Sequence, residues 1–232
     1  SRPLTPCSSA VGRFSRPGAR SSPSVTIAFT VLLWICGSAV EICSAAYFLD
    51  DRLESAVAHA IFADGAGAFL IGPSDEAGIG RTIWGADGSE FEGITIEPNW
   101  LEYRDLVAAQ GICPWPTLRM EGQKVFKWAV GSMVDVCYRA LESAGLTAAD
   151  IAVFVPHQAN NRITDALVRG LKFPEHVVVA RDIITTGNTS AASIPLALDT
   201  LVKDGVAKSG DLALLVGFGA GLAYAAQVIR VP

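Results

Sequence analysis

The sequence has 232 residues, of which 50% are hydrophobic and 18% are charged, a composition that excludes a disordered, collagen-like or coiled-coil protein. The net charge of −5 argues against wholesale nucleic-acid binding. Five cysteines without a C-x-x-C pair and three scattered histidines match no disulfide framework and no zinc site. We therefore expect a globular protein of a reducing, cytoplasmic compartment, without a metal centre.

Charge is distributed unevenly along the chain. The first 40 residues contain four arginines and no acidic residue, so a net charge of −9 falls on the remaining 192 residues. Residues 1–24 are rich in Ser, Pro and Arg and are predicted to be irregular. The apolar run that follows, residues 25–36, is too short to span a membrane. Its β-branched and aromatic residues favour a buried strand, with a secretory signal or a chance or mistranslated sequence as the alternatives.

The middle of the chain contains one clear periodic segment. Two apolar segments flank residues 64–67 (DGAG), and we interpret these glycines as a turn between two buried strands. Residues 81–118 show no period and are predicted to be loops and short strands. Residues 120–144 repeat apolar side chains at three- and four-residue spacing, which predicts a long amphipathic helix that ends at Gly145.

The last third of the chain alternates strand and helix patterns. The predicted strands are residues 151–155, 176–180, 212–216 and 222–229, and the predicted helices are residues 160–171 and 190–203. Such alternation is typical of a layered α/β domain. The last two strands surround a glycine-rich turn, so they should form a hairpin and make the sheet mixed.

Two polar clusters follow predicted strands, where α/β folds gather their ligands. One contains His157, which can be structural or catalytic, among Gln, two Asn and Arg. In the other, Gly187 suits a tight turn and Thr189 or Ser190 a helix cap. This leaves the amide of Asn188 free to donate hydrogen bonds. A neutral His157 and Asn188 that converge at adjacent strand ends would be a donor pair suited to an oxyanion or an enolate.

Three motifs in the same order and spacing point to a family: residues 157–163 (HQANNRI), 187–195 (GNTSAASIP) and 217–221 (GFGAG). They closely resemble the C-terminal half of 3-oxoacyl-[acyl-carrier-protein] synthase III. Residues 64–68 (DGAGA) and 122–127 (GQKVFK) resemble the family's glycine turn and a helix start. The resemblance covers about residues 41–230 and implies an α/β, thiolase-like layered fold with mixed sheets and buried helices, usually in a homodimer.

The resemblance also implies a division of the chain. We expect an irregular segment at residues 1–40, a remnant of the N-terminal thiolase-like half at 41–118, and a C-terminal domain at 119–232. The expected fold therefore comprises a complete C-terminal half and a partial, truncated or scrambled N-terminal half.

The reaction implied is a decarboxylative Claisen condensation of acyl-coenzyme A with malonyl-acyl carrier protein, in fatty-acid or polyketide biosynthesis. His157 and Asn188 match the two residues that promote decarboxylation and stabilise the enolate. Gln123 stands where an Asn commonly contacts coenzyme A, and the pocket and carrier-docking positions are matched by Phe126, Ala159 and Arg162. No cofactor is implied beyond the coenzyme A and phosphopantetheine thioesters, and neither a membrane nor a nucleic acid is an expected partner.

The family's nucleophilic cysteine has only a weak counterpart. Cys7 lies about where the nucleophile helix should begin, but Pro17 would break that helix. Cys36 and Cys43 are better explained as strand residues. Residues 41–51 also resemble type III polyketide synthases, whose His motif differs from this one. The alternatives to a condensing acyltransferase are therefore a related polyketide-synthase-like enzyme, a non-catalytic thiolase-fold subunit and an inactive fragment.

Overall fold

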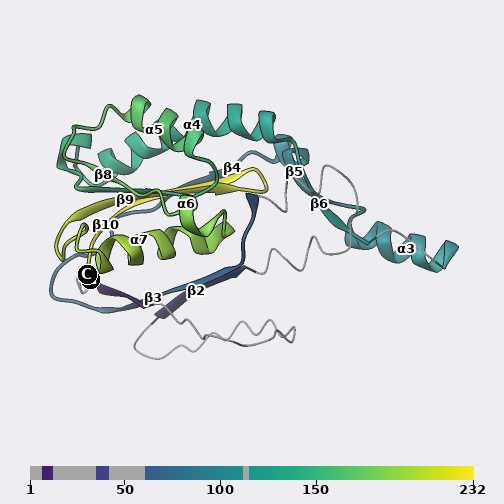
Figure 1. Cartoon of the computed structure of the whole chain (residues 1–232), viewed down its shortest axis with the longest axis horizontal. Helices are drawn as coiled ribbons and strands as arrows, with labels where there is room; N and C mark the ends of the chain where they lie inside the picture. The colour runs from purple at the N-terminus through teal and green to yellow at the C-terminus, as the bar shows by residue number, and fades with distance from the viewer. Residues whose placement is uncertain (1–6, 13–34, 42–60, 112–114) are drawn as a thin grey trace, which may run out of the picture.

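The computed structural model describes residues 7–12, 35–41, 61–111 and 115–232, which form a layered α/β structure (Figure 1). Outside the described residues lie most of the predicted irregular segment, most of the apolar run and residues 42–51, which include Cys43 and all but the first residue of the stretch that resembles polyketide synthases. Within the described ranges, no helix is long and apolar enough to cross a membrane.

A five-stranded mixed sheet forms the centre of the molecule. Its strands, in spatial order, are β4 (Ile83–Ala86), β10 (Ala223–Arg230), β9 (Leu212–Gly219), β7 (Val153–Pro156) and β8 (Val178–Val179). Strand β7 runs parallel to both β8 and β9, whereas β10 is antiparallel to both β9 and β4. The predicted C-terminal hairpin and the mixed sheet are therefore confirmed.

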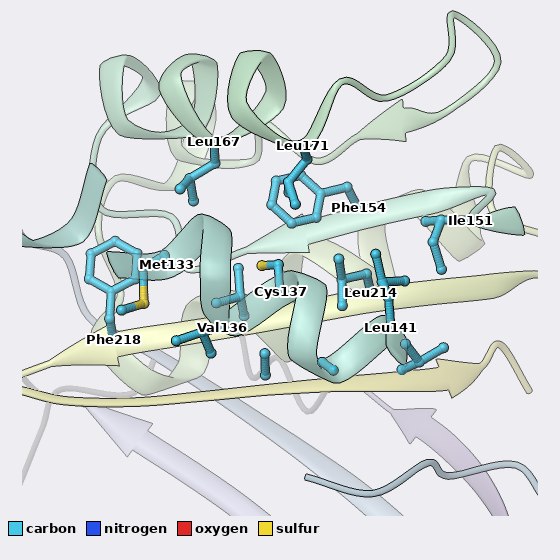
Figure 2. Close-up of a cluster of buried hydrophobic side chains, with 14 of the residues drawn as sticks. Met133, Val136, Cys137, Leu141, Ile151, Phe154, Leu167, Leu171, Leu214 and Phe218 are labelled. Atoms are coloured by element: carbon cyan, nitrogen blue, oxygen red, sulfur yellow. The ribbon is translucent and has the colours of Figure 1, made fainter. Parts of the chain in front are cut away.

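Helices cover both faces of this sheet (Figure 1). On one face lie α4 (Gly122–Ser143) and α5 (Asn161–Leu171), and on the other lies α7 (Ser193–Lys203). Side chains alternate along the strands, since Phe154 packs toward α4 and α5 while Val153 and Val155 join the core on the α7 side. Figure 2 shows the first of these cores, which includes Met133 and Leu141 of α4 and Leu167 and Leu171 of α5. Burial on both faces explains why these strands read as continuous apolar runs.

Helix α4 confirms the periodic segment of the sequence. Its buried residues are Val125, Ala129, Met133, Val136, Cys137, Ala140 and Leu141, one continuous stripe at three- and four-residue spacing. Gly145 follows the helix with a φ of 68°, a left-handed conformation that glycine adopts without steric cost. The predicted end of the helix is therefore correct.

A second, three-stranded sheet lies on the far side of α7 (Figure 1). Its strands are β1 (Cys7–Gly12), β3 (Gly65–Pro73) and β2 (Ile35–Glu41), with β3 between the other two and antiparallel to both. Cys36 lies in β2, as predicted. Two expectations are wrong. Residues 7–12 form a strand although their composition predicted an irregular segment, and the glycines of residues 64–67 stand at the start of β3, not in a turn between strands.

The glycines of β3 serve close packing. A β-carbon at Gly67 would lie 2.5 Å from Cγ of Pro195 in α7, and one at Gly65 would lie 2.8 Å from Cγ2 of Thr189. Both distances are far below ordinary contact, so only glycine lets the buried helix and the loop before it approach the strand. Tertiary contact, not turn geometry, is the physical reason for this motif.

Residues 81–118, predicted to be loops and short strands, also contain a helix. Besides the paired strands β5 (Ile94–Glu97) and β6 (Thr117–Met120) and the 3-10 helix Gly88–Gly93, this region forms α3 (Trp100–Gln110). No residue of α3 is buried, so the helix has no apolar period to detect. The available signal was the capping box, in which Asn99 and Glu102 exchange side-chain and backbone hydrogen bonds.

We predict that Gly67→Ala lowers the free energy of unfolding by about 1–3 kcal/mol, the usual cost of overpacking a core. The added methyl group would overlap the ring of Pro195. Urea denaturation followed by tryptophan fluorescence measures the change.

The matched control is Gly219→Ala, because Gly219 is also a strand residue and its added β-carbon would meet no atom within 4 Å. Equal stabilities of the two variants would contradict the packing argument.

Candidate functional site

His157 lies at the carboxyl end of β7, where the chain leaves the sheet toward α5. Its backbone N–H donates to the carbonyl of Val216 on β9, at 2.7 Å. The parallel pairing of β7 with β9 thus continues one residue beyond Pro156. The sequence correctly predicts this strand-to-helix junction, and the half-buried imidazole is held at the sheet edge where α/β folds place their ligands.

The hydroxyl group of Ser193 contacts the imidazole ring of His157 and bears on which ring nitrogen carries the proton. Nδ1 of His157 lies 2.7 Å from Oγ of Ser193, and that oxygen also accepts from the backbone N–H of Gln158 at 3.2 Å. The Ser193 hydroxyl donates to no other described residue, which leaves its proton available to Nδ1. We therefore assign the tautomer in which Nδ1 accepts and Nε2 carries the proton.

Burial keeps this ring neutral. It lowers the pKa of His157 to about 4, because the imidazolium ion loses its hydration inside the protein. The ring of Phe218 stands edge-on to the imidazole, with centroids 5.4 Å apart and an interplanar angle of 75°. At pH 7 His157 is thus an uncharged hydrogen-bond donor at Nε2 and a weak base.

Asn188 is buried and held through its backbone. Its N–H donates to the carbonyl of Ile61 at 2.9 Å, and its carbonyl accepts from the N–H of Ala63 at 2.8 Å. Gly187, with a φ of 72°, makes the turn that brings Asn188 into this pairing. A β-carbon at Gly187 would also lie 3.0 Å from that of Ala63. Residues 61–63 therefore clamp the segment that carries Asn188.

The side chain of Asn188 has a fixed orientation. Its Oδ1 accepts from the backbone N–H of Ser190 at 2.9 Å, in a local turn that helps hold Ser190 at a φ of 50°. Neither Thr189 nor Ser190 caps the helix through its side chain, so the predicted cap is wrong and Asn188 itself serves this turn. The amide nitrogen Nδ2 faces the opposite way, and no described residue accepts a hydrogen bond from it.

The segments before and after Asn188 are hydrogen-bonded to Gln158 and His157, respectively. After Asn188 the chain enters a 3-10 turn (Ser190–Ala192) and reaches Ser193, which binds the imidazole. Before it lies α6 (Ile183–Thr186), whose first N–H donates to Oε1 of Gln158 at 3.2 Å. The structure thus connects the segments that carry the two predicted donors. It adds Ser193, Gln158 and Phe218, all inside the polar or glycine motifs but not singled out from the sequence.

The other predicted site residues lie around this centre. Phe126, in the first turns of α4, and Ala159 are half-buried and pack against the core cluster that contains Phe218. Gln123 and Arg162 are exposed, each in the first turn of its helix. No described hydrogen bond joins Gln123 or the Arg162 guanidinium to His157. The structure therefore packs Phe126 and Ala159 against the core cluster that contains Phe218 and leaves Gln123 and Arg162 at the surface.

No described cysteine stands at the N-terminus of a helix, the position that activates a nucleophilic thiol. Cys137 is buried in α4, and burial raises the pKa of its thiol to about 12, so the reactive thiolate does not form at neutral pH. Cys7 begins strand β1 and does not stand at a helix N-terminus. The described part of the chain also contains no cluster of three His, Cys, Asp or Glu residues that could hold a metal ion.

The chain is similar to known proteins over most of its length. The family described as 3-oxoacyl-[acyl-carrier-protein (ACP)] synthase III C terminal matches residues 141–231. The chain is 53% identical over 180 residues to the beta-ketoacyl-[acyl-carrier-protein] synthase III of Streptomyces glaucescens, a match that covers 78% of this chain and 53% of that protein. The chain thus spans about half the length of the curated relatives it matches.

Solved structures are similar as well. The priming beta-ketosynthase of the R1128 polyketide biosynthetic pathway is 44% identical with a TM-score of 0.77, over 86% of this chain and 57% of that one. The 3-oxoacyl-[acyl-carrier-protein] synthase III of Aquifex aeolicus is 36% identical with a TM-score of 0.71, over 85% and 57%. These similarities confirm the thiolase-like layered fold that the sequence motifs implied.

The low pKa of His157 predicts a specific pH dependence of stability. The unfolded chain binds the proton near the ordinary pKa of 6.5, whereas the folded protein binds it near 4. Between these values the unfolded state holds more protons, so stability present above pH 6.5 is lost as the pH falls toward 4. We expect a loss on the order of 3 kcal/mol, measured by urea denaturation across this range.

His157→Gln should remove this component of the pH dependence, because glutamine does not titrate. The control is His176→Gln, which removes an exposed imidazole and keeps His157. If wild type and His157→Gln lost stability in parallel below pH 6.5, the buried neutral imidazole would be refuted.

Proposed function

The chain belongs to the beta-ketoacyl-[acyl-carrier-protein] synthase III family, and from this premise we propose that it carries the decarboxylation site of a condensing acyltransferase. The proposed reaction joins acyl-coenzyme A and malonyl-acyl carrier protein into 3-oxoacyl-acyl carrier protein, in fatty-acid or polyketide biosynthesis. His157 and Asn188 are the proposed catalytic residues.

The reaction needs donors that become useful when negative charge develops. The bond between the malonyl carboxylate and the α-carbon breaks, CO₂ leaves, and the electron pair moves into an enolate whose oxygen carries the charge. Nε2–H of His157 and Nδ2–H of Asn188 would bind this oxygen. The enolate carbon then attacks an acyl thioester, and its thiolate leaves. Fixed donors aimed at a developing oxyanion act without reorganisation, which is the main source of their effect.

One observation carries this proposal: the His157–Ser193 hydrogen bond of 2.7 Å on a half-buried ring whose pKa is about 4. A base with such a pKa removes protons poorly at neutral pH, because efficient general bases have a pKa close to the working pH. A neutral ring whose Nδ1 is already occupied can still donate from Nε2. This favours enolate stabilisation over a proton-abstraction role for His157.

The substrates would reach the donor pair from the side of α4 and α5. Phe126 and Ala159 would line the pocket of the pantetheine arm, and Gln123 would contact coenzyme A. The exposed Arg162 and Arg169 lie on α5, seven residues apart and so on one helix face. Their positive charge suits an anionic phosphopantetheine carrier. We propose no cofactor beyond these thioester substrates, and a homodimer of the cytoplasm as the working assembly.

The similarity to a priming beta-ketosynthase of polyketide biosynthesis favours a second candidate, the same condensation in polyketide priming. Both candidates use one decarboxylation site and differ in the acyl group and the carrier. We further propose two of the divisions expected from the sequence, a partial N-terminal half at 41–118 and the C-terminal domain at 119–232. The third, an irregular segment at 1–40, is contradicted by strands β1 and β2.

The experiment that tests the proposal is the release of CO₂ from malonyl-coenzyme A by the purified chain. Asn188→Asp keeps an oxygen for the N–H of Ser190 but removes the Nδ2–H₂ donor. We expect the rate to fall about 100- to 1,000-fold, the usual effect of removing one oxyanion donor.

Asn99→Asp is the matched control, because it makes the same change at the cap of α3, outside the site. Its rate should equal that of the wild type. A wild-type chain that releases no CO₂, or an Asn188→Asp chain as fast as wild type, would overturn the proposed function. Thermal melting of the chain, alone and mixed with an intact relative, would then be compared. A cooperative melt that appeared only in the mixture would identify the chain as a non-catalytic subunit.

A further inference from the structure

Gln158 is a polar side chain in an otherwise apolar position. It is 1% exposed, yet its amide makes three hydrogen bonds. Nε2 donates to the carbonyl of Pro156 at 2.7 Å and to that of Ala180 at 3.4 Å. Oε1 accepts from the N–H of Ile183 at 3.2 Å. Both donors and the acceptor of this buried amide are therefore occupied, as burial requires.

These partners lie on two different segments. Pro156 is the last residue of β7, immediately before His157, whereas Ala180 precedes α6 and Ile183 is its first residue. A methionine would fill a similar volume without the desolvation cost of an amide. The amide is thus a specific link between the strand that presents His157 and the segment that precedes Asn188.

The link reaches Asn188 through one rigid turn. Within α6, the N–H of Gly187 donates to the carbonyl of Ile183 at 3.0 Å, and Oγ1 of Thr186 donates to that of Asp182 at 2.8 Å. The position of Ile183 therefore determines that of Gly187, the residue before Asn188. On the far side of Asn188, the backbone N–H of Gln158 holds the hydroxyl of Ser193.

We propose that Gln158 is a positioning residue that sets the separation and direction of the two donors, His157 and Asn188. It contacts the segments before and after Asn188 while it adjoins His157 in the chain. The inference rests on the proposed function, because the consequence of the link is the alignment of two donors on one enolate oxygen. Gln158 itself touches no reacting atom.

Steady-state decarboxylation of malonyl-coenzyme A by the full chain separates positioning from binding. Gln158→Met keeps the volume and removes all three side-chain hydrogen bonds. We expect kcat to fall about 10- to 100-fold, the effect of a misplacement near 1 Å, with KM changed less than about twofold, since lost transition-state contacts appear in kcat.

The control is Gln227→Met, because Gln227 also uses its amide to tie two loop residues, Gly80 and Thr82, to a strand outside the site. Its kcat should match that of wild type. A kcat of Gln158→Met equal to that of Gln227→Met would overturn the proposal.

If Gln158→Met loses its structure, Gln158→Glu takes its place. The glutamate keeps the acceptor for the N–H of Ile183 and, when protonated, one donor. Its kcat relative to wild type should recover as the pH is lowered from 8 to 5.5, and a constant ratio would count against the inference.

A second readout does not depend on activity. The side-chain amide signals of Asn188 in ¹H–¹⁵N NMR spectra should shift or broaden in Gln158→Met and stay unchanged in Gln227→Met. If the wild-type chain releases no CO₂, the proposed function fails while this spectrum still decides the role of Gln158. Unchanged Asn188 signals in Gln158→Met would refute the positioning role whatever the activity.

Discussion

The hydrogen bond between Ser193 and His157 is the interaction on which the candidate site depends. It fixes the ring that ends one strand to the first residue of the buried helix α7, at 2.7 Å. Because Ser193 follows Asn188 by five residues, the same contact connects the segment that carries Asn188 to His157. Burial then keeps the ring uncharged, so that Nε2 is a donor without the strong positive charge that would attract unrelated anions.

This interaction is possible because α7 is held between two sheets. The helix packs under the five-stranded sheet through Ala197 and Leu198, and β3 approaches it from the other side (Figure 1). Gly65 and Gly67 allow that approach. The pairing of residues 61–63 with Asn188 continues the same contact. Segments before residue 73 therefore help to place a donor that lies far along the chain, and the site belongs to the layered fold, not to one loop.

The sequence predicted the C-terminal layers well, because strands buried on both faces and an amphipathic α4 have strong periodic signals. The prediction that His157 and Asn188 are site residues comes from the polar clusters that follow two strands, and it stays a prediction. It failed where long-range contact determines structure: the glycines of residues 64–67 looked like a turn but serve packing against α7. Helix α3 escaped because it buries no residue. Ser193 and Gln158 could not be singled out as site residues from the sequence, because their hydrogen-bond partners lie 36 and 25 residues away in the chain.

Long-range ¹H–¹⁵N NMR spectra of the His157 imidazole at pH 7 test the central claim most directly, because they report the protonation of each ring nitrogen. The account predicts a neutral ring with the proton on Nε2 and an unprotonated Nδ1 that accepts from Ser193. A ring protonated on Nδ1, or an imidazolium ion at this pH, would contradict it.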